Sequence, residues 1–172
     1  CGMLKDLGVA SVLVGHSERR HVLLESDPLI AKKVDFAINR EFQVVLCVGE
    51  TLEQREMGST LEIVLGQVQS GLESVNHDSM KNIVIAYEPV WAIGTGKTAS
   101  AEDAQAVHSA IRGELASRYD DDVASLTRIQ YGGSVKPENA KELFACPDID
   151  GALVGGAALS GESFAAIIEA AC

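Results

Sequence analysis

The stretch Tyr87-Glu88-Pro89-Val90-Trp91-Ala92-Ile93-Gly94-Thr95-Gly96-Lys97 lies between an apolar run, Ile83–Tyr87, and a helical pattern that opens near Ser100. This order predicts a strand, a loop and a helix. Glu88 follows the strand directly, and the apolar loop after it contains two glycines and Trp91, the only tryptophan of the chain. A carboxylate beneath an apolar, glycine-hinged flap is typical of a base that works away from water. A glutamate that only ends a strand, before glycines that only make a turn, is the alternative that the stretch leaves open.

The same alternation of strand and helix recurs along the whole chain. Strands are predicted at residues 11–15, 43–48, 83–87, 127–131 and 150–154. Helices are predicted at residues 2–7, 27–40, 60–75, 101–119, 137–144 and 161–170, together with a short helix capped by Ser17. The strands are apolar on both faces, which favours a parallel sheet covered by helices.

Residues that carry chemistry, or that carry no side chain, follow every predicted strand; they are His16, Glu50, Glu88, Gly132-Gly133-Ser134 and Gly155-Gly156. In a closed (β/α)8 barrel all such positions face one mouth, whereas an open sheet spreads them along an edge. No Gly-x-Gly-x-x-Gly motif follows an early strand, which argues against a dinucleotide-binding fold. A complete barrel takes eight β-α units and roughly 250 residues. We therefore predict a single α/β domain over residues 1–172 that is an incomplete barrel, with units missing from its N-terminal side.

Two glycine-rich strand ends suit a phosphate group. Gly132-Gly133-Ser134 and Gly155-Gly156 lack side chains that would block a close approach, and each precedes a helix or turn whose free N–H groups can point at an anion. They follow the last two strands, which is where barrels of this class bind phosphate. Each pair taken alone is also compatible with a plain turn.

His16 lies at a strand end beside a predicted helix N-terminus. The positive end of a helix dipole disfavours the imidazolium form, so His16 could donate a hydrogen bond as a neutral ring to a developing oxyanion. A structural histidine remains the alternative at this position. The other histidines, His21, His77 and His108, fall in helical or connecting segments and are predicted to be surface or packing residues.

Composition excludes several classes of partner. The net charge of −11, without a basic patch, argues against nucleic acid, so an anionic ligand must be held by local donors. Hydrophobic residues make up 47% of the chain, but no apolar run reaches membrane-spanning length. The four cysteines are far apart, show no metal-type spacing and fit a reducing, cytoplasmic location, with Cys47 predicted as a buried thiol. No cluster of His, Cys and carboxylate residues suggests a metal.

A phosphate site, a carboxylate base and a neutral histidine together favour one reaction class. That class is abstraction of a proton from a carbon next to a carbonyl group. It requires neither a nucleophilic intermediate nor a cofactor.

Three segments resemble the triosephosphate isomerase family: residues 87–97, Val14-Gly15-His16-Ser17-Glu18-Arg19-Arg20 and Tyr131-Gly132-Gly133-Ser134-Val135. The resemblance runs from the end of the family's third helix to the C-terminus. It implies a TIM barrel of which this chain has five of the eight β-α units, the fourth to the eighth. It also implies the interconversion of dihydroxyacetone phosphate and glyceraldehyde 3-phosphate through an enediol(ate), in glycolysis and gluconeogenesis.

The resemblance also implies roles for individual residues. Glu88 would be the base and His16 the neutral electrophile, while residues 89–99 would form a closing lid with Lys97 at its hinge. Backbone N–H groups would hold the substrate phosphate at Gly94, Ser134, Gly155 and Gly156. Tyr131 and Ser134 would brace the lid, Glu50 would meet Trp91, and Glu18 would lie behind the residues that touch substrate.

This sequence departs from the family pattern in one large respect. The family has a catalytic lysine preceded by an asparagine at the end of its first strand, and a loop after its third strand that builds a homodimer; neither region is present here. We therefore expect the 172-residue chain alone to self-associate, with activity near background, and to regain turnover when the missing units are supplied. A homodimer is expected of the full-length family member, with the interface largely absent from this chain. The alternatives are another phosphate-binding barrel enzyme, which should lack the Glu-Pro-Val-Trp segment, and a non-catalytic half-barrel.

Overall fold

The computed structural model describes residues 1–93 and 98–171, and its centre is a five-stranded parallel sheet. The strands are β1 (Ser11–Val14), β2 (Gln43–Val48), β3 (Ile83–Tyr87), β4 (Ile129–Tyr131) and β5 (Gly151–Ala152). They lie in the order β1-β2-β3-β4-β5, so each strand pairs with the next one in the chain. A doubly wound sheet reverses this order at a switch point, and no reversal occurs in the described sheet. The sequential order is that of part of a barrel wall.

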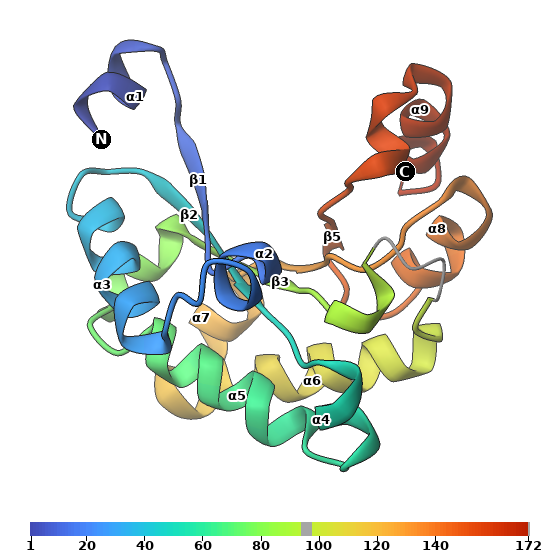
Figure 1. Cartoon of the computed structure of the whole chain (residues 1–172), viewed down its shortest axis with the longest axis horizontal. Coiled ribbons are helices and arrows are strands. Elements are labelled where there is room, and N and C mark those ends of the chain that lie inside the picture. Colours follow the sequence, from blue (N-terminus) through green and yellow to red (C-terminus); the bar gives the residue numbers. More distant parts are fainter. Residues whose placement is uncertain (94–97, 172) are drawn as a thin grey trace.

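Helices follow the strands and cover one side of the sheet. The α-helices are α1 (Gly2–Asp6), α2 (Ser17–His21), α3 (Asp27–Ile38), α4 (Leu52–Glu56), α5 (Thr60–Gly71), α6 (Ala101–Arg118), α7 (Asp121–Leu126), α8 (Pro137–Phe144) and α9 (Gly161–Glu169). Short 3-10 turns are η1 (His77–Asn82), η2 (Val90–Ala92) and η3 (Gly156–Leu159). The edge strands β1 and β5 lie at opposite flanks, and the two termini stand far apart above them (Figure 1). No helix in the described ranges is long and apolar enough to cross a membrane.

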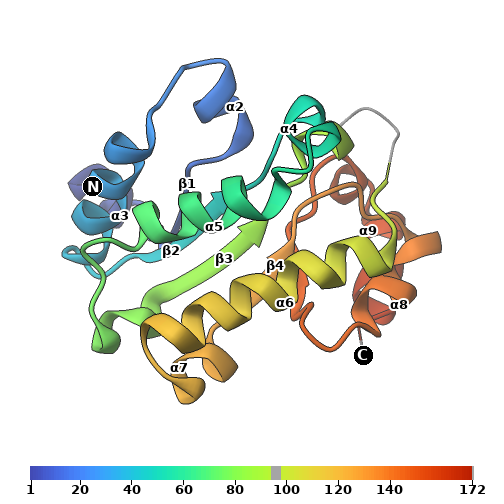
Figure 2. The same cartoon turned by 90° about the horizontal axis from the view of Figure 1, so that it is seen from below.

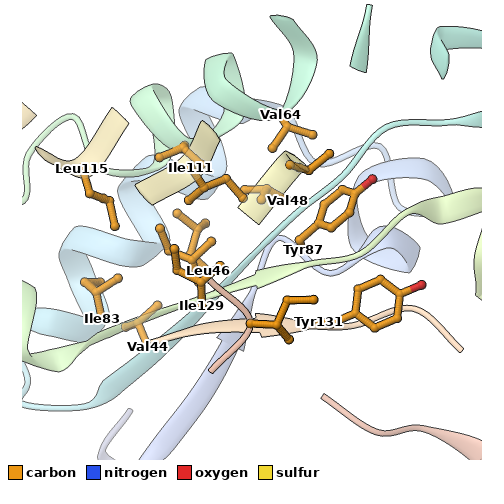
Figure 3. Close-up of a cluster of buried hydrophobic side chains, with 14 of the residues drawn as sticks. Val44, Leu46, Val48, Val64, Ile83, Tyr87, Ile111, Leu115, Ile129 and Tyr131 are labelled. Atoms are coloured by element: carbon orange, nitrogen blue, oxygen red, sulfur yellow. The ribbon is translucent and has the colours of Figure 1, made fainter. Parts of the chain in front are cut away.

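The main core lies between the sheet and the helices α3, α5 and α6. Alternate residues of β2, β3 and β4 point toward these helices, which run across the same face of the sheet (Figure 2). Val44, Leu46, Val48, Ile83, Tyr87, Ile129 and Tyr131 meet Val64, Ile111 and Leu115 there (Figure 3). The opposite face carries the smaller cluster Val45, Cys47, Val84 and Ala86. Cys47 is therefore buried, as the sequence predicted.

The predicted strands and longer helices are confirmed, but several of their boundaries differ in the structure. The fourth strand begins at Ile129, not at residue 127, because α7 occupies the preceding residues and Thr127 Oγ1 donates to the carbonyl of Val123 at 2.8 Å. The fifth strand covers only Gly151–Ala152, the two residues that pair with Gln130 and Tyr131 of β4. The helix expected to reach residue 75 ends at Gly71.

Candidate active site

One cavity of about 490 Å³ lies at the carboxyl ends of the strands. Its walls come from the ends of four strands and from the segment after β3; they are Leu13, His16, Glu88, Ile93, Gly132-Gly133-Ser134-Val135-Lys136 and Leu153-Val154-Gly155-Gly156-Ala157. Five residues singled out from the sequence therefore meet in one place: His16, Glu88, Ser134, Gly155 and Gly156. Parallel strands bring this about because all their carboxyl ends lie at the same edge of the sheet.

Glu88 and His16 contact each other at the floor of this cavity. The Nε2 atom of His16 lies 3.3 Å from Oε1 of Glu88, and the backbone N–H of Ser17 donates to Oε2 at 3.2 Å. Glu88 is 3% exposed, and burial raises the pKa of its carboxyl group above the ordinary glutamate range. His16, the Ser17 N–H and the Cys47 thiol oppose that rise in pKa without cancelling it. A carboxylate of raised pKa is a stronger base than an exposed one.

Two glycines make room for Glu88. A Cβ atom at Gly49 would lie 1.8 Å from the carbonyl oxygen of Glu88, and one at Gly132 would lie 2.7 Å from its Cγ. The backbone N–H of Glu88 donates to the carbonyl of Val48 at 2.7 Å. The neighbouring strand ends thus fix both the main chain and the side chain of this residue.

The hydrogen bonds of His16 define its tautomer. The backbone N–H of Glu18 donates to Nδ1 of His16 at 3.3 Å, across the start of α2. Because Nδ1 accepts a hydrogen bond, the proton of the neutral ring lies on Nε2, which faces Glu88 and the cavity. His16 can therefore donate from Nε2 as a neutral group.

The other end of the cavity is lined by main chain. A Cβ atom at Gly155 or Gly156 would meet no atom within 4 Å, so these positions border open space. No hydrogen bond from the N–H groups of Ser134, Gly155 or Gly156 is found within the described part of the chain. Lys136, at the start of α8, adds a cationic side chain to the wall. An anion can be held here by N–H groups and one nearby cation.

Glu50 forms a second group of contacts behind Glu88. Its side chain is fully buried, and it accepts hydrogen bonds from Trp91 Nε1 at 2.9 Å and from the Tyr87 hydroxyl at 3.1 and 3.2 Å. The expected meeting of Glu50 with Trp91 is present in the structure. Burial, followed by the charge of Glu50, raises the pKa of Tyr87.

The remaining predicted residues lie outside the cavity wall. Tyr131 is fully buried beneath Gly133, where a Cβ atom would come within 2.2 Å of the tyrosine hydroxyl. The Glu18 side chain is exposed, and it is its backbone N–H that touches His16. Gly94, and with it the centre of the expected lid, lies outside the described residues.

Sequence reasoning missed two charged residues near this site. Lys136 lines the cavity, and Arg55 in α4 lies beside Glu50 and Trp91. Lys136 follows the Gly-Gly-Ser-Val segment directly, so its proximity to the phosphate-type loop was a usable signal. Arg55 follows a Thr-x-x-Gln capping box, Thr51 to Gln54, which marks α4 as a helix at the end of β2.

No group of His, Cys, Asp and Glu residues within residues 1–93 and 98–171 could hold a metal ion. Cys1, Cys47 and Cys146 are free thiols. Of the histidines predicted to be structural, His77 is exposed and His108 is completely buried in α6.

Comparison with known proteins identifies the family. A family model described as triosephosphate isomerase matches residues 1–171. The triosephosphate isomerase of Thermoanaerobacter pseudethanolicus is 56% identical over 167 residues, which are 97% of this chain and 67% of that relative. That of Chloroherpeton thalassium is 55% identical over 169 residues, 98% of this chain and 67% of the relative. That of Moorella thermoacetica is 55% identical over 167 residues, with 97% and 67% covered. The chain thus spans about two thirds of the length of these relatives, and it belongs to the triosephosphate isomerase family.

Proposed function

We propose that residues 1–172 carry the proton-transfer site of a triosephosphate isomerase, which interconverts dihydroxyacetone phosphate and glyceraldehyde 3-phosphate. The observation that carries this proposal is the contact, at 3.3 Å, between buried Glu88 and partly exposed His16, at one end of a cavity whose other end is lined by Gly155 and Gly156. A base, a neutral hydrogen-bond donor and an anion cradle in one cavity suit a small phosphorylated carbonyl compound.

Each group has one part in the reaction. The Glu88 carboxylate removes a proton from the carbon next to the carbonyl, and the C–H electron pair moves into a carbon–carbon double bond. The Nε2–H of His16 donates to the oxygen on which negative charge develops, giving an enediol(ate). A proton also moves from the hydroxyl oxygen of the first carbon to the former carbonyl oxygen, and return of the carbon-bound proton from Glu88 to the neighbouring carbon then completes the isomerisation. One carbon is oxidised as the other is reduced, so there is no net redox change and no external co-reactant is needed.

The phosphate group of the substrate is held at the glycine-lined end. Ser134, Gly155 and Gly156 supply N–H groups, and Lys136 supplies a positive charge near the wall. Local donors matter here because the chain carries a net charge of −11. Fixing the phosphate also places the reacting carbons against Glu88, and such positioning is a large part of catalysis.

We propose further that the five strands are the fourth to eighth units of a (β/α)8 barrel, in one domain of residues 1–172. The sequential parallel order and the two unpaired edges, β1 and β5, support this. In this arrangement the portion of the relatives outside the match would close the barrel between those edges. The homodimer belongs to the proposal as a property of the complete barrel.

The test compares Glu88→Gln with the wild type. We define the supplemented chain as residues 1–172 joined to the portion of the Thermoanaerobacter pseudethanolicus relative that lies outside the match. In the supplemented chain, Glu88→Gln should lower kcat by about 10²- to 10⁴-fold or more, because an amide cannot accept the carbon-bound proton. Substrate affinity, measured by titration calorimetry, should change little.

Glu62→Gln, an exposed carboxylate on α5, is the matched control and should leave kcat unchanged. Near-normal turnover in Glu88→Gln would remove Glu88 from the mechanism. A folded wild-type supplemented chain without isomerase activity would instead favour the non-catalytic half-barrel.

A further inference from the structure

The segment that carries Glu88 is held from both sides by Glu50. Tyr87, one residue before Glu88, and Trp91, three residues after it, both donate to the Glu50 carboxylate. The backbone N–H of Val90 also donates to the carbonyl oxygen of Glu50 at 3.0 Å. The position of Glu88 therefore depends on where the Glu50 carboxylate is fixed.

Arg55 is the cation beside this buried carboxylate. Its Nη1 atom lies 3.8 Å from Oε1 of Glu50, and its Nη2 atom lies 2.8 Å from Oδ2 of Asp103. Its guanidinium carbon lies 4.7 Å from the centre of the Trp91 ring, within the range of a cation–π contact. One side chain from α4 thus reaches the end of β2, the aromatic residue after β3 and the first turn of α6.

The three contacts of Arg55 together help to hold the segment that carries Glu88. Removing one partner of a buried ion pair leaves an uncompensated charge, and Arg55 lies at ion-pair distance from fully buried Glu50 in the described structure. The guanidinium plane also covers one face of the indole whose Nε1–H donates to Glu50. The ion pair with Asp103, a residue that is about half exposed, anchors the guanidinium from the outer side.

We infer that Arg55 is a positioning residue for the proton-transfer step, acting through Glu50 and Trp91 on the segment that carries Glu88. This inference rests on the proposed isomerase function. Arg55 does not line the cavity and does not touch substrate. Without it, Glu50 turns toward water, Tyr87 and Trp91 lose their common acceptor, and Glu88 moves relative to the substrate carbon.

The inference is tested first by fluorescence, because Trp91 is the only tryptophan of the 172-residue chain. Arg55→Met should shift the Trp91 emission to longer wavelength and increase its quenching by acrylamide. Arg118→Met is the matched control: Arg118 also covers an aromatic ring, that of Tyr119, and binds the carbonyl of Leu72, but it lies at the far end of α6. The control should leave the Trp91 emission unchanged.

Kinetics in the supplemented chain supply the second readout. Arg55→Met should lower kcat by about 10- to 100-fold, because a displacement of a catalytic group by about 1 Å has an effect of that order. KM should change by less than about twofold, since the phosphate cradle is untouched. Arg55→Lys keeps the charge near Glu50 and Asp103 and should recover most of kcat.

Asp103→Asn is a milder variant that keeps Arg55 and loosens only its outer anchor. It should give a smaller emission shift and a smaller loss of kcat, and it serves in place of Arg55→Met if that variant does not fold. Unchanged Trp91 emission in both variants would overturn the inference, as would a loss of kcat equal to that of Arg118→Met. A wild-type supplemented chain without activity would refute the proposed function, whereas the emission experiment would still decide whether Arg55 fixes Trp91.

Discussion

Arg112, near the amino ends of the strands, and Glu88, at the carboxyl end of β3, show two different ways in which this fold holds charge. At the amino ends of β4 and β5, Arg112 of α6 pairs with Asp148 at 2.6 Å and with Asp150 at 2.7 Å, and donates to the carbonyl of Ala124 at 2.6 Å. At the carboxyl ends, the polar partners of Glu88 in the described structure are the His16 ring, the Ser17 backbone N–H and the Cys47 thiol. Arg112 is paired with two carboxylates, whereas the Glu88 carboxylate has no Lys or Arg partner within ion-pair distance in the described structure.

The pKa directions follow this difference. Burial raises the pKa of Asp148, but hydrogen bonds from Gln105 and Arg112 outweigh it and bring the pKa below the ordinary aspartate range. Burial also raises the pKa of Glu88, and there the opposing contacts are too weak to reverse it. A carboxylate paired with a cation, such as Asp148, stabilises the fold, whereas a buried carboxylate without one, such as Glu88, keeps a raised pKa and is a stronger base.

The largest effect is expected for a variant that removes the ion pairs of Arg112. Arg112→Met should lower the free energy of unfolding by about 3–5 kcal/mol, because it leaves two carboxylates without their cation in a partly buried site. In the supplemented chain kcat should stay within about twofold, since the variant lies at the opposite end of the sheet from Glu88. Urea unfolding followed by circular dichroism gives the first quantity and the isomerase assay the second. Arg112→Lys should recover part of the stability, and a variant that unfolds normally but loses turnover would contradict the division between the two ends.

The next largest effect is expected for a substitution of His16, the residue that contacts Glu88. His16→Gln in the supplemented chain should lower kcat by roughly 10²- to 10³-fold, the usual effect of removing one donor to a developing oxyanion. The pH profile should keep nearly the same shape, because in the proposed mechanism the ring only donates from Nε2–H and the titrating base is Glu88. The rate from pH 5 to 9 and an NMR titration of His16 provide the check. A His16 ring that is charged at neutral pH would be inconsistent with the donor role.

A third prediction concerns the layer between the ends, where His108 is completely buried between Tyr87 and the carbonyl of Asp148. Burial lowers the pKa of His108 to about 4. The unfolded chain therefore binds this proton more readily, and stability should fall by about 3 kcal/mol as the pH drops from about 6.5 to about 4. The full contribution is present above that range.

His108→Phe should remove this part of the acid dependence, as measured by urea unfolding at a series of pH values. His77→Gln is the control: the hydrogen bond to Asp120 raises the pKa of His77, so its contribution is lost at higher pH and leaves the acid range unaffected. An equally steep acid dependence in His108→Phe would show that another group is responsible.

The smallest effect is expected for Lys136, and it tests whether a charged side chain helps to bind the substrate phosphate. Lys136→Gln should raise KM about two- to fivefold without changing kcat, since an exposed charge contributes about 1 kcal/mol or less and is screened by salt. Lys141→Gln, also exposed and on the same helix, is the control. KM measured at low and at high ionic strength should converge in the variant. Identical KM values for Lys136→Gln and the wild type would leave phosphate binding to the main chain alone.

The site residues that could be predicted from sequence are those that directly follow a strand, because their position depends only on the common direction of the parallel strands. Glu88, His16 and the glycine pairs each follow an apolar run, and parallel strands bring such positions to one edge whatever the details of packing. The short helices were harder to predict because a cap decides them more than periodicity does. The Asp120 carboxylate accepts from the Val123 N–H at 2.7 Å and so begins α7 where a strand was expected shortly after.

Arg55 shows why other residues near the site could not be predicted from the sequence. Its three contacts join α4, the segment after β3 and α6, which are separated by dozens of residues in the chain. No periodicity in the sequence relates Arg55 to Asp103 or to Trp91. Only the packing of three separate units defines that meeting point.

The sequential strand order has a consequence for how the chain is made. Each strand forms its ladder with the unit synthesised just before it, and no pairing in the described sheet skips a neighbour. A unit that emerges from the ribosome can therefore add to the growing edge at once, without waiting for a distant partner. During synthesis the exposed edge of the described sheet moves forward one strand at a time, from β1 toward β5.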